Sequence, residues 1–208
     1  MKIELENIAK KFKKEWIFKD ISFDFHINNS YAITGPNGSG KSTLMKIISS
    51  AVTPSSGKVF YSSSNKPSIP DKEIYKEIAF CAPYMALISE FTLLEMLEFQ
   101  EKIIPYQQNL NSKQIISDIL KFEKHQNKQL RYFSSGMLQR VKLILSVLAE
   151  KSILLLDEPA TNLDESGLNW YHQLINDFSK EKIVIVASNQ KREYTFCTDE
   201  LNLLKYKS

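Results

Sequence analysis

The chain has 208 residues, of which 43% are hydrophobic and 25% are charged, and its net charge is +3. This length fits one domain or two small lobes, and the hydrophobic fraction is enough for a packed core. The small net charge gives no sign of a nucleic-acid or lipid partner, and no apolar run approaches the roughly 18 residues of a membrane-spanning helix. Cys81 and Cys197 are expected to be free, buried thiols, and the three histidines lie too far apart for metal-ligand spacing.

The first part of the chain is predicted to form an antiparallel edge sheet. Residues 3–8 and 17–27 alternate apolar and polar side chains, as half-buried strands do. Phe12 lies in their connection, with lysines on both sides of it. Two interpretations of this segment stay open: a solvated loop in which Phe12 packs against the sheet edge, or an exposed aromatic face that could stack on a purine ring.

Residues 30–50 carry the most specific motif of the chain. A short buried strand at 30–34 precedes a Gly-rich loop, and the residues after Lys41 and Ser42 are apolar at helical spacing. The loop fits G-x-x-x-x-G-K-[ST], whose backbone N–H groups surround phosphates at a helix N-terminus. Lys41 would reach the β- and γ-phosphates, and the Ser42 hydroxyl would ligate Mg²⁺. The predicted nucleotide-binding residues of this segment are Gly35, Asn37, Gly38, Ser39, Gly40, Lys41, Ser42 and Thr43.

The segment after this motif returns to strands and turns. A turn at 53–57 leads into a strand at 58–61, and a polar loop rich in Ser and Pro follows at 62–70. A compact apolar strand at 78–82 is then stopped by Pro83.

Two helices are predicted next, at 91–104 and 113–122, because each places apolar side chains on one face. Residues 105–112 separate them. Residues 84–132 are therefore predicted to be a helical insertion in an α/β domain. A longer helix, at about 137–149, follows the insertion, with Ser135 as the expected N-cap.

The run of Ile and Leu at 153–156 is typical of a parallel strand that is buried on both faces. It ends in Asp157 and Glu158, at the strand end where α/β sheets bind ligands. Asp157 is expected to order Mg²⁺ through water, and Glu158 to polarise the attacking water as a general base. The alternative is that the two acids only form a surface turn.

The last third of the chain completes the alternation of strands and helices. A helix is expected at 165–179, a buried strand at 183–187 that leads into Asn189, and a last short strand at 201–204.

These motifs, in this order, resemble those of the nucleotide-binding subunit of ABC transporters. GPNGSGKST (35–43) is similar to that family's Walker A motif, and ILLLDEP (153–159) to its Walker B motif. YFSSGMLQR (132–140) resembles a degenerate form of the signature motif LSGGQ, and TNLD (161–164) resembles the D-loop. Phe12 stands where the family's adenine-stacking aromatic residue is expected.

The resemblance implies one ABC-type P-loop NTPase domain over residues 1–208. Its α/β fold would have a mixed β-sheet core, an antiparallel β edge subdomain and an inserted helical subdomain at about 84–132. ATP and Mg²⁺ are the implied cofactors. Ser134, Ser135 and Gly136 would cap the γ-phosphate held by a second chain, so the family resemblance implies a head-to-tail homodimer or a pair with another ABC subunit.

The same resemblance implies a place and a partner in the cell. A separate transmembrane permease would be driven by ATP hydrolysis, and the chain would lie on the cytoplasmic face of the membrane, held there only through that permease. Repair and translation ATPases of the same superfamily fit less well, because the chain has neither a long coiled-coil insertion nor a second cassette, and no nucleic-acid partner is expected.

Four positions depart from the family pattern. In the signature, Ser135 replaces a glycine and Met137 replaces a glutamine. Pro83 stands where a metal-contacting glutamine is expected, and Asn189 stands in the place of a switch histidine. Asn189 is assigned a catalytic role with Glu158, although an amide cannot carry a positive charge or transfer a proton. ATP binding with slow hydrolysis is therefore expected, and the alternative function is an ATP-binding, dimerising regulatory module with little or no turnover.

Overall fold

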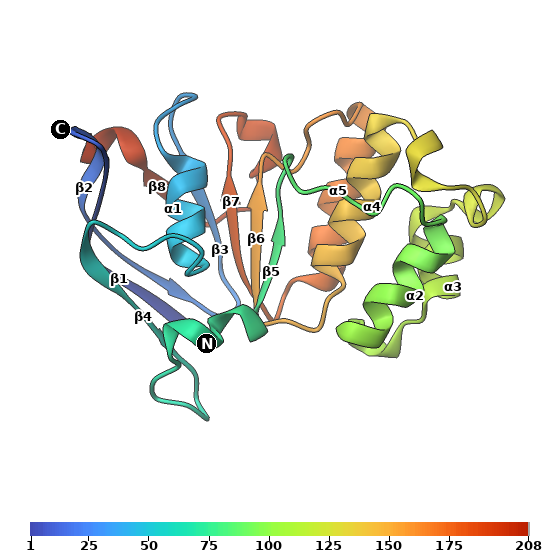
Figure 1. Ribbon diagram of the computed structural model, residues 1–208, viewed down its shortest axis with the longest axis horizontal. Coiled ribbons are helices and arrows are strands. Elements are labelled where there is room, and N and C mark those ends of the chain that lie inside the picture. Colours follow the sequence, from blue (N-terminus) through green and yellow to red (C-terminus); the bar gives the residue numbers. More distant parts are fainter. Residues whose placement is uncertain (208) are drawn as a thin grey trace. The chain divides into compact units, whose positions relative to one another are not determined.

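The computed structural model describes residues 1–207 and divides the chain into two compact units (Figure 1). Unit 1 contains Met1–Phe80, Lys151–Glu158 and the segment from Ser179 to the end of the described chain, and unit 2 contains Cys81–Glu150 and Pro159–Phe178. The strands are β1 (Lys2–Phe12), β2 (Glu15–His26), β3 (Ser30–Thr34), β4 (Ser56–Ser62), β5 (Ile78–Cys81), β6 (Ile153–Asp157), β7 (Ile183–Ala187) and β8 (Asp199–Asn202). The α-helices are α1 (Lys41–Ile48), α2 (Leu93–Ile103), α3 (Ser112–Gln114), α4 (Ser135–Val147) and α5 (Glu165–Phe178).

Shorter helical turns connect these elements. One is a π-helix at Ile115–Leu120, which continues directly from α3. The others are 3₁₀ helices at Asp71–Lys76, Gln107–Asn109, Glu123–His125, Leu130–Tyr132, Lys191–Glu193 and Leu203–Tyr206. None of the helices in residues 1–207 is long and apolar enough to cross a bilayer.

Unit 1 begins with the antiparallel sheet that the alternating pattern predicts. Its strand order is β2-β1-β4, and both partners of β1 run antiparallel to it. Ile3 and Leu5 on β1 are buried, whereas Glu4 between them is more exposed, so one face of the sheet is apolar. The alternation is interrupted at Asn7, where a positive φ of 49° accompanies a register shift between β1 and its neighbours.

The second sheet of unit 1 has the strand order β5-β6-β7-β3-β8. β3 runs parallel to both β7 and β8, and β6 runs parallel to β7. All residues of β6 and β7 are buried, which explains why their sequences are continuous apolar runs without alternation. Because the carboxyl ends of β3, β6 and β7 share one edge, the segments that follow these three strands meet there.

Helix α1 packs in the core of unit 1, against β6 and β7 of the parallel sheet (Figure 1). Leu44, Ile47 and Ile48 are at most 1% exposed and belong to a cluster that also includes side chains of both sheets. Phe25 and Tyr31 add an edge-to-face aromatic contact with ring centroids 4.9 Å apart. This packing fixes the helix that follows the Gly-rich loop.

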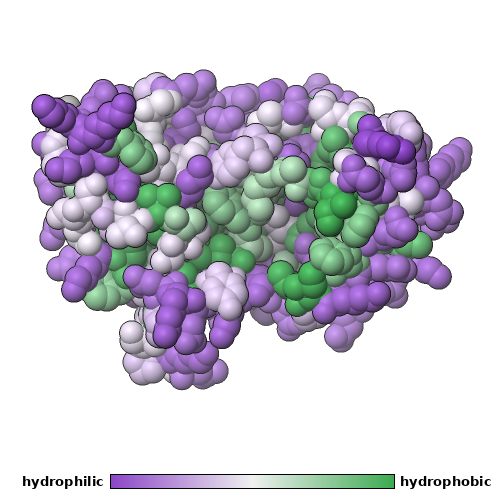
Figure 2. All heavy atoms as spheres, in the orientation of Figure 1, coloured by the Kyte–Doolittle hydropathy of each residue, from purple (hydrophilic) through white to green (hydrophobic). Residues whose placement is uncertain are grey.

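Unit 2 is helical, apart from its first residue in β5. α2 begins with a capping box in which Thr92 and Glu95 satisfy each other's backbone N–H groups, and α4 packs against α5. The Gln107 side chain donates to the carbonyls of Val147 and Phe178, 2.8 Å from each, and so joins the ends of α4 and α5. Hydrophobic residues reach the surface over α2 and α4 (Figure 2).

Several expected details need correction. Ser134, not Ser135, is the N-cap of α4, because its hydroxyl accepts a hydrogen bond from Met137 N at 3.2 Å, and the helix therefore begins at Ser135. The last strand is Asp199–Asn202, and the residues after it form a 3₁₀ helix. Cys197 is only partly buried, although Cys81 is buried and both are free thiols.

Candidate functional site

The Gly-rich loop joins the carboxyl end of β3 to the start of α1 in unit 1. Gly35 and Gly40 have φ values of 144° and 103°, and a Cβ at Gly40 would lie 2.5 Å from the Ile17 side chain. Any other residue at position 40 would therefore meet both backbone strain and a clash. The loop can keep its tight course only with glycine there, and the free N–H groups of the first turn of α1 point out of the helix N-terminus.

Lys41, the first residue of α1, folds back over this loop. Its Nζ donates to the carbonyls of Gly35 and Pro36, at 2.9 and 3.2 Å, and the residue is 6% exposed. The ammonium group is therefore held at the loop by two weakly bound neutral acceptors. Phosphate oxygens are stronger acceptors for such a donor, so the arrangement suits an exchange of these carbonyls for an anion.

Asp157 ends β6 and is 2% exposed, with an Oδ1 atom that has no hydrogen-bond partner among the described residues. Burial raises the pKa of this carboxyl above its usual range, a hydrogen bond with the Ser42 side chain opposes that shift, and the nearby Glu158 charge adds to it. A buried carboxylate with one oxygen that has no partner among the described residues, beside a hydroxyl, offers oxygen donors of the kind that Mg²⁺ prefers. The two residues fit the predicted magnesium site.

No group of three or more His, Cys, Asp or Glu side chains in residues 1–207 could hold a metal ion by itself. Ser42 and Asp157 would therefore act as a pair of protein donors. Mg²⁺ in phosphate-binding sites typically takes one or two protein ligands and completes its shell with phosphate oxygens and waters. The small donor set agrees with an ion that enters together with a nucleotide.

Glu158 follows directly and has an unusual backbone conformation. Its φ is 47°, in the left-handed region, and its N–H donates to Ala187 O on β7 at 2.9 Å. A residue of this kind in that region costs about 1–3 kcal/mol and persists where the surroundings hold it. The bond to β7 turns the chain out of the sheet, so Glu158 sits at the same edge as the Gly-rich loop.

Asn189 reaches the Gly-rich loop from the end of β7. Its Nδ2 donates to Asn37 Oδ1 at 2.9 Å, while the preceding Ser188 is fully buried and donates its N–H to Ile33 O. The structure thus brings Asn189 to the loop, as its position after the strand predicts. It also shows that the side chain donates to a protein amide there, a contact that the sequence did not indicate.

Phe12 is the end of β1 and is 52% exposed. Lys10 Nζ lies 5.2 Å from the centroid of its ring. Of the two open interpretations, the exposed aromatic face fits the structure better than packing against the sheet edge. A second aromatic residue, Trp16 on β2, belongs to no motif of the sequence. The ammonium groups of Lys11 and Lys19 lie 5.2 and 4.9 Å from the centroid of its ring.

The predicted signature residues lie in unit 2, where they line a pocket of about 450 Å³. Ser134 caps α4, and the N-terminal N–H groups of that helix face the pocket region. A Cβ at Gly136 would lie 2.9 Å from Asn162 O, so glycine is required for the helix to approach residue 162 this closely. The pocket is lined by Phe122, Ser134, Ser135, Gly136, Met137, Arg140, Asn162, Leu163 and Asp164.

Six of the nine pocket residues were not predicted as site residues, among them Phe122 and Arg140. Phe122 comes from the segment before the signature, and Arg140 from the second turn of α4, where its guanidinium stacks on Trp170 with 5.1 Å to the ring centroid. The pocket also contains Asp164, whose pKa is lowered by the Gly167 N–H and by the Ser166 hydroxyl. Arg140 is the last residue of the signature segment 132–140, and its place one turn after Gly136 on α4 was the signal that could have assigned it to the site.

Pro83 follows β5 in unit 2 and is exposed. Its carbonyl accepts a hydrogen bond from Lys142 Nζ at 3.0 Å. A proline offers no side-chain oxygen or nitrogen, so this position cannot contact a metal through its side chain, as the sequence predicted.

A protein-family model described as "ABC transporter" matches residues 18–161. The chain is 28% identical over 196 residues to an uncharacterized ABC transporter ATP-binding protein, YybJ of Bacillus subtilis, covering 92% of this chain and 86% of that protein. It is 31% identical over 202 residues to the sulfate/thiosulfate import ATP-binding protein CysA of Nitrosomonas europaea, covering 92% of this chain and 55% of that protein.

Solved structures resemble the chain over nearly its whole length. A putative ABC transporter ATP-binding protein from Pyrococcus furiosus has a TM-score of 0.84 at 24% identity, with all of both chains covered, and this likeness concerns the fold. The ATP-binding cassette MJ0796, solved as a dimer in a post-hydrolysis state bound to ADP and Pi, has a TM-score of 0.79 at 25% identity, covering 96% of this chain and 93% of that one.

Proposed function

The chain belongs to the ABC transporter family, and we propose from this premise that it binds and hydrolyses Mg-ATP as the ATP-binding subunit of an ABC transporter. One observation carries the proposal. In unit 1, the loop after β3 and the end of β6 lie at one edge of the parallel sheet and supply an anion cradle, a buried carboxylate and an acid in a strained backbone conformation. Phosphate binding, metal binding and water activation are the three tasks of a triphosphatase.

The Gly-rich loop and Lys41 would bind the phosphate groups. The backbone amides at the start of α1 and the Lys41 ammonium supply positive charge, and Lys41 is already within 3.2 Å of the loop carbonyls that it would release. Ser39, Ser42 and Thr43 add hydroxyl groups around the loop. Phe12 would stack on the adenine ring through its exposed face.

Ser42 and Asp157 would hold Mg²⁺. When bound, the ion would neutralise charge on the β- and γ-phosphate oxygens and orient them. Binding would also remove the electrostatic penalty of the buried Asp157 carboxylate, whose Oδ1 has no partner among the described residues.

Glu158 would act as the general base that orients and polarises the attacking water. Asn189 would then be the group that senses the γ-phosphate, since its amide can leave Asn37 and donate to a phosphate oxygen. An amide cannot supply the charge of a protonated imidazole, so the chemical step is expected to be slow.

A second chain would complete the site. Unit 2 carries a pocket at the start of α4, with Ser134, Ser135 and Gly136 in its wall and the positive end of the helix dipole directed at it. In a head-to-tail dimer, this pocket would cap the γ-phosphate held by the other chain, and each chain would contribute two half-sites. The dimeric state of the MJ0796 cassette supports this proposal.

A separate transmembrane permease is the proposed partner, which would place the chain on the cytoplasmic face of the membrane. Tyr84, Met85 and Ile88, after β5, are 39–55% exposed although they are large and apolar. Beside them, an apolar pocket of about 230 Å³ is lined by Leu87, Leu130 and Leu138, among others. A helix of the permease would dock here with its apolar face. Residues 84–132 would thus be a helical subdomain within one ABC domain over residues 1–208.

A second candidate function follows from the bond between Asn189 and Asn37. If that bond persists when nucleotide is bound, the site has no mobile donor for the γ-phosphate. The chain would then be a regulatory module that binds ATP and dimerises with little turnover.

The proposal is tested with the purified full chain and a fluorescent ATP analogue. Lys41→Ala should abolish retention of the nucleotide, because the cradle loses the ammonium group that the structure places over the loop. Glu158→Gln should retain the nucleotide and lower kcat by about 10²–10⁴-fold, the usual range for a lost general base. The matched control is Glu165→Gln at the start of α5, which should change neither.

Three outcomes of this experiment separate the candidate functions. Unchanged nucleotide retention in Lys41→Ala would contradict the proposal as a whole. Measurable turnover that is lost in Glu158→Gln supports the enzyme. Nucleotide binding without turnover in the wild-type chain, and without change in Glu158→Gln, favours the regulatory module.

A further inference from the structure

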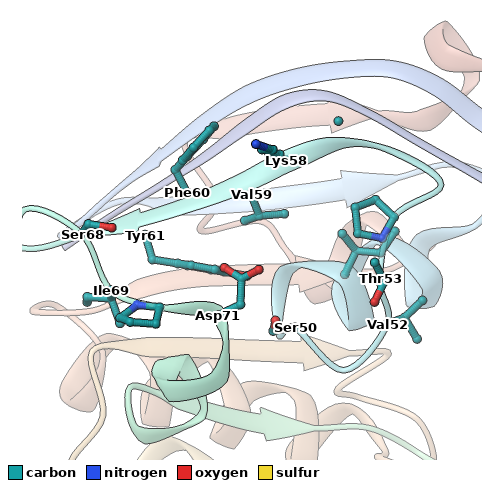
Figure 3. Close-up of a pocket in the computed structure, with 14 residues that line it drawn as sticks. Ser50, Val52, Thr53, Lys58, Val59, Phe60, Tyr61, Ser68, Ile69 and Asp71 are labelled. Atoms are coloured by element: carbon teal, nitrogen blue, oxygen red, sulfur yellow. The ribbon is translucent and has the colours of Figure 1, made fainter.

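Unit 1 contains a pocket that takes no part in the proposed nucleotide site. Its volume is about 440 Å³, and it lies between β4, the turn after α1 and the segment before the 3₁₀ helix at Asp71–Lys76 (Figure 3). Pockets of roughly 300–1,000 Å³ hold small organic molecules. The lining residues are Ile47, Ser50, Val52, Thr53, Pro54, Gly57, Lys58, Val59, Phe60, Tyr61, Ser68, Ile69, Pro70 and Asp71.

The floor of this pocket is apolar. Val59 and Tyr61 point into it from the inner face of β4, and Ile69 lies opposite them (Figure 3). Lys58 and Phe60 alternate with these residues and lie on the other side of the strand in the same view, where both are exposed. The lysine ammonium is therefore directed away from the floor.

Of the two charged residues that line the pocket, Asp71 rather than Lys58 is directed into it, and the Ser50, Thr53 and Ser68 hydroxyls can both donate and accept. The Asp71 side chain points between Tyr61 and Ser50 in Figure 3 and is solvent-accessible. The Tyr61 hydroxyl donates to Ile48 O at 2.9 Å, at the end of α1 where the helix dipole is negative. Burial raises the pKa of the Tyr61 phenol above its usual range, and the negative charge of Asp71 raises it further. The negative charge of Asp71 therefore acts on the Tyr61 hydroxyl inside the pocket.

We propose that this pocket is a binding site for a small organic ammonium compound, with a protonated amine that pairs with Asp71 and a ring or short apolar chain that lies on Val59, Tyr61 and Ile69. Charge decides the class of ligand. An anion would be repelled by the Asp71 carboxylate and by the negative end of α1, and a neutral molecule would gain no charge pairing from Asp71.

The proposed ligand is distinct from ATP. Both sites involve α1, but they lie at its opposite ends: Lys41 and Ser42 form the start of the helix, whereas Ile47 and Ser50 of the pocket lie at and beyond its end. Eight helical residues span about 12 Å. Nothing in the proposed nucleotide chemistry uses Asp71, so the two proposals can fail separately.

The experiment uses the full chain labelled with ¹⁵N and follows its backbone amide signals by NMR during titration. The probe is phenethylamine, which is protonated at pH 7. The two comparison compounds, 2-phenylethanol and 3-phenylpropionate, keep the ring on a short chain but are neutral and negative. Phenethylamine should give saturable shifts at the residues around the pocket, with a Kd at least about tenfold below that of either comparison compound, which corresponds to one charged pair.

Variants at position 71 test whether the Asp71 carboxylate is the group that pairs with the amine. Asp71→Asn, which keeps the shape of the side chain, should weaken phenethylamine binding at least about tenfold, and Asp71→Lys should reverse the preference in favour of 3-phenylpropionate. Glu73→Gln on the same 3₁₀ helix is the matched control, because Glu73 does not line the pocket, and it should leave the Kd unchanged. Unchanged amide signals outside the pocket show that each variant is folded.

The proposal is overturned if phenethylamine gives no saturable shift at the pocket, if 2-phenylethanol binds equally well, or if Asp71→Asn leaves the Kd unchanged. Mg-ATP is added to the same wild-type sample as an independent arm. If Mg-ATP shifts the signals of the Gly-rich loop but phenethylamine shifts none at the pocket, only the inference about the pocket is wrong. If phenethylamine shifts the pocket signals but Mg-ATP shifts none at the loop, only the proposed nucleotide site is wrong.

Discussion

Asn189 and Asn37 are 152 positions apart in the sequence, and their side chains are joined by a hydrogen bond of 2.9 Å. The bond connects the segment after β7 to the middle of the Gly-rich loop. It occupies the Asn189 amide with a neutral acceptor, at the position where the family pattern has a histidine. We expect the state of this one donor to set how fast the site can turn over.

Asn189→His should raise kcat for ATP hydrolysis by at least about tenfold, because one preorganised donor at a reacting centre is worth roughly 10²–10³ in rate. Asn189→Ala should lower kcat and loosen the Gly-rich loop, since Asn37 loses its partner. Steady-state phosphate release at saturating Mg-ATP measures both effects.

The control for this prediction is Gln190→His, which places the same imidazole one residue further along. The Gln190 side chain accepts a hydrogen bond from Arg192 and is not bonded to the loop, so the control should not accelerate turnover. If Asn189→His is no faster than the wild-type chain, the amide is not the limiting feature of the site, and the slow-hydrolysis expectation loses its basis.

Glu158 is the proposed general base, and its backbone is strained. A substitution can measure the effect of the strain on stability separately from the effect on catalysis. Its φ of 47° costs about 1–3 kcal/mol, and glycine removes that strain at an entropic cost of about 0.5–1 kcal/mol. Glu158→Gly should therefore raise the free energy of unfolding by about 1 kcal/mol while it abolishes turnover. Urea denaturation of the nucleotide-free chain measures the first effect.

Asn162→Gly is the matched variant for this comparison. Asn162 has a similar φ of 66°, but asparagine tolerates the left-handed region, so this replacement should give no gain in stability. A lower free energy of unfolding in Glu158→Gly than in the wild-type chain would show that the backbone at position 158 stores no strain.

The sequence predicted most of unit 1 because its signals are local and strong. The buried runs of β6 and β7 and the Gly-rich loop each have a pattern that few other structures share, and all three were placed correctly. The ends of elements were predicted less well. Ser134 and Ser135 are both good N-cap residues, and only the hydrogen bond to Met137 N distinguishes them.

Long-range contacts were outside the reach of sequence patterns. The bond between Asn189 and Asn37, and the approach of Asn162 to Gly136, depend on how distant segments pack. The pocket around Asp71 was missed for the same reason. The residues that line it come from segments predicted only to be a turn, a strand and a polar loop, and Asp71 is not part of any motif. Whether 84–132 acts as a subdomain stays a prediction.

Asp157 gives a stability prediction that depends on pH. Burial raises its pKa in the folded chain above the value in the unfolded chain, so the unfolded chain loses this proton first as the pH rises. The ionised carboxylate therefore destabilises the nucleotide-free fold above the folded pKa, and the effect vanishes below the unfolded value of about 4. Asp157→Asn should have a higher free energy of unfolding than the wild-type chain at pH 7, and the gap should close on acidification.

The same pair of proteins tests the magnesium assignment. Saturating Mg-ATP should stabilise the wild-type chain more than Asp157→Asn, because the ion binds only the carboxylate form well. Glu98→Gln, an exposed acid on α2, should match the wild-type chain under every condition. A gap that stays constant between pH 7 and pH 4 would contradict the assigned cause, and equal stabilisation by Mg-ATP would remove Asp157 from the metal site.

A substitution at Gly136 is the most stringent test of the proposed half-site at the start of α4. A methyl group there would lie 2.9 Å from Asn162 O, a backbone atom, so Gly136→Ala must shift either the start of α4 or the segment at 162. Because the pocket at the start of α4 is proposed to cap the nucleotide of another chain, the variant should bind ATP as a monomer but lose dimerisation in Mg-ATP. Ser135→Gly, which restores the glycine of the family signature, should dimerise at least as well as the wild-type chain.

Light scattering coupled to gel filtration, with Glu158→Gln as the common background to prevent hydrolysis, measures the two outcomes. Dimers of normal abundance in the Gly136→Ala variant would show that the helix start does not contact the nucleotide of the partner, whereas loss of ATP binding by the variant monomer would place Gly136 in the fold of its own chain and not in the lid of another.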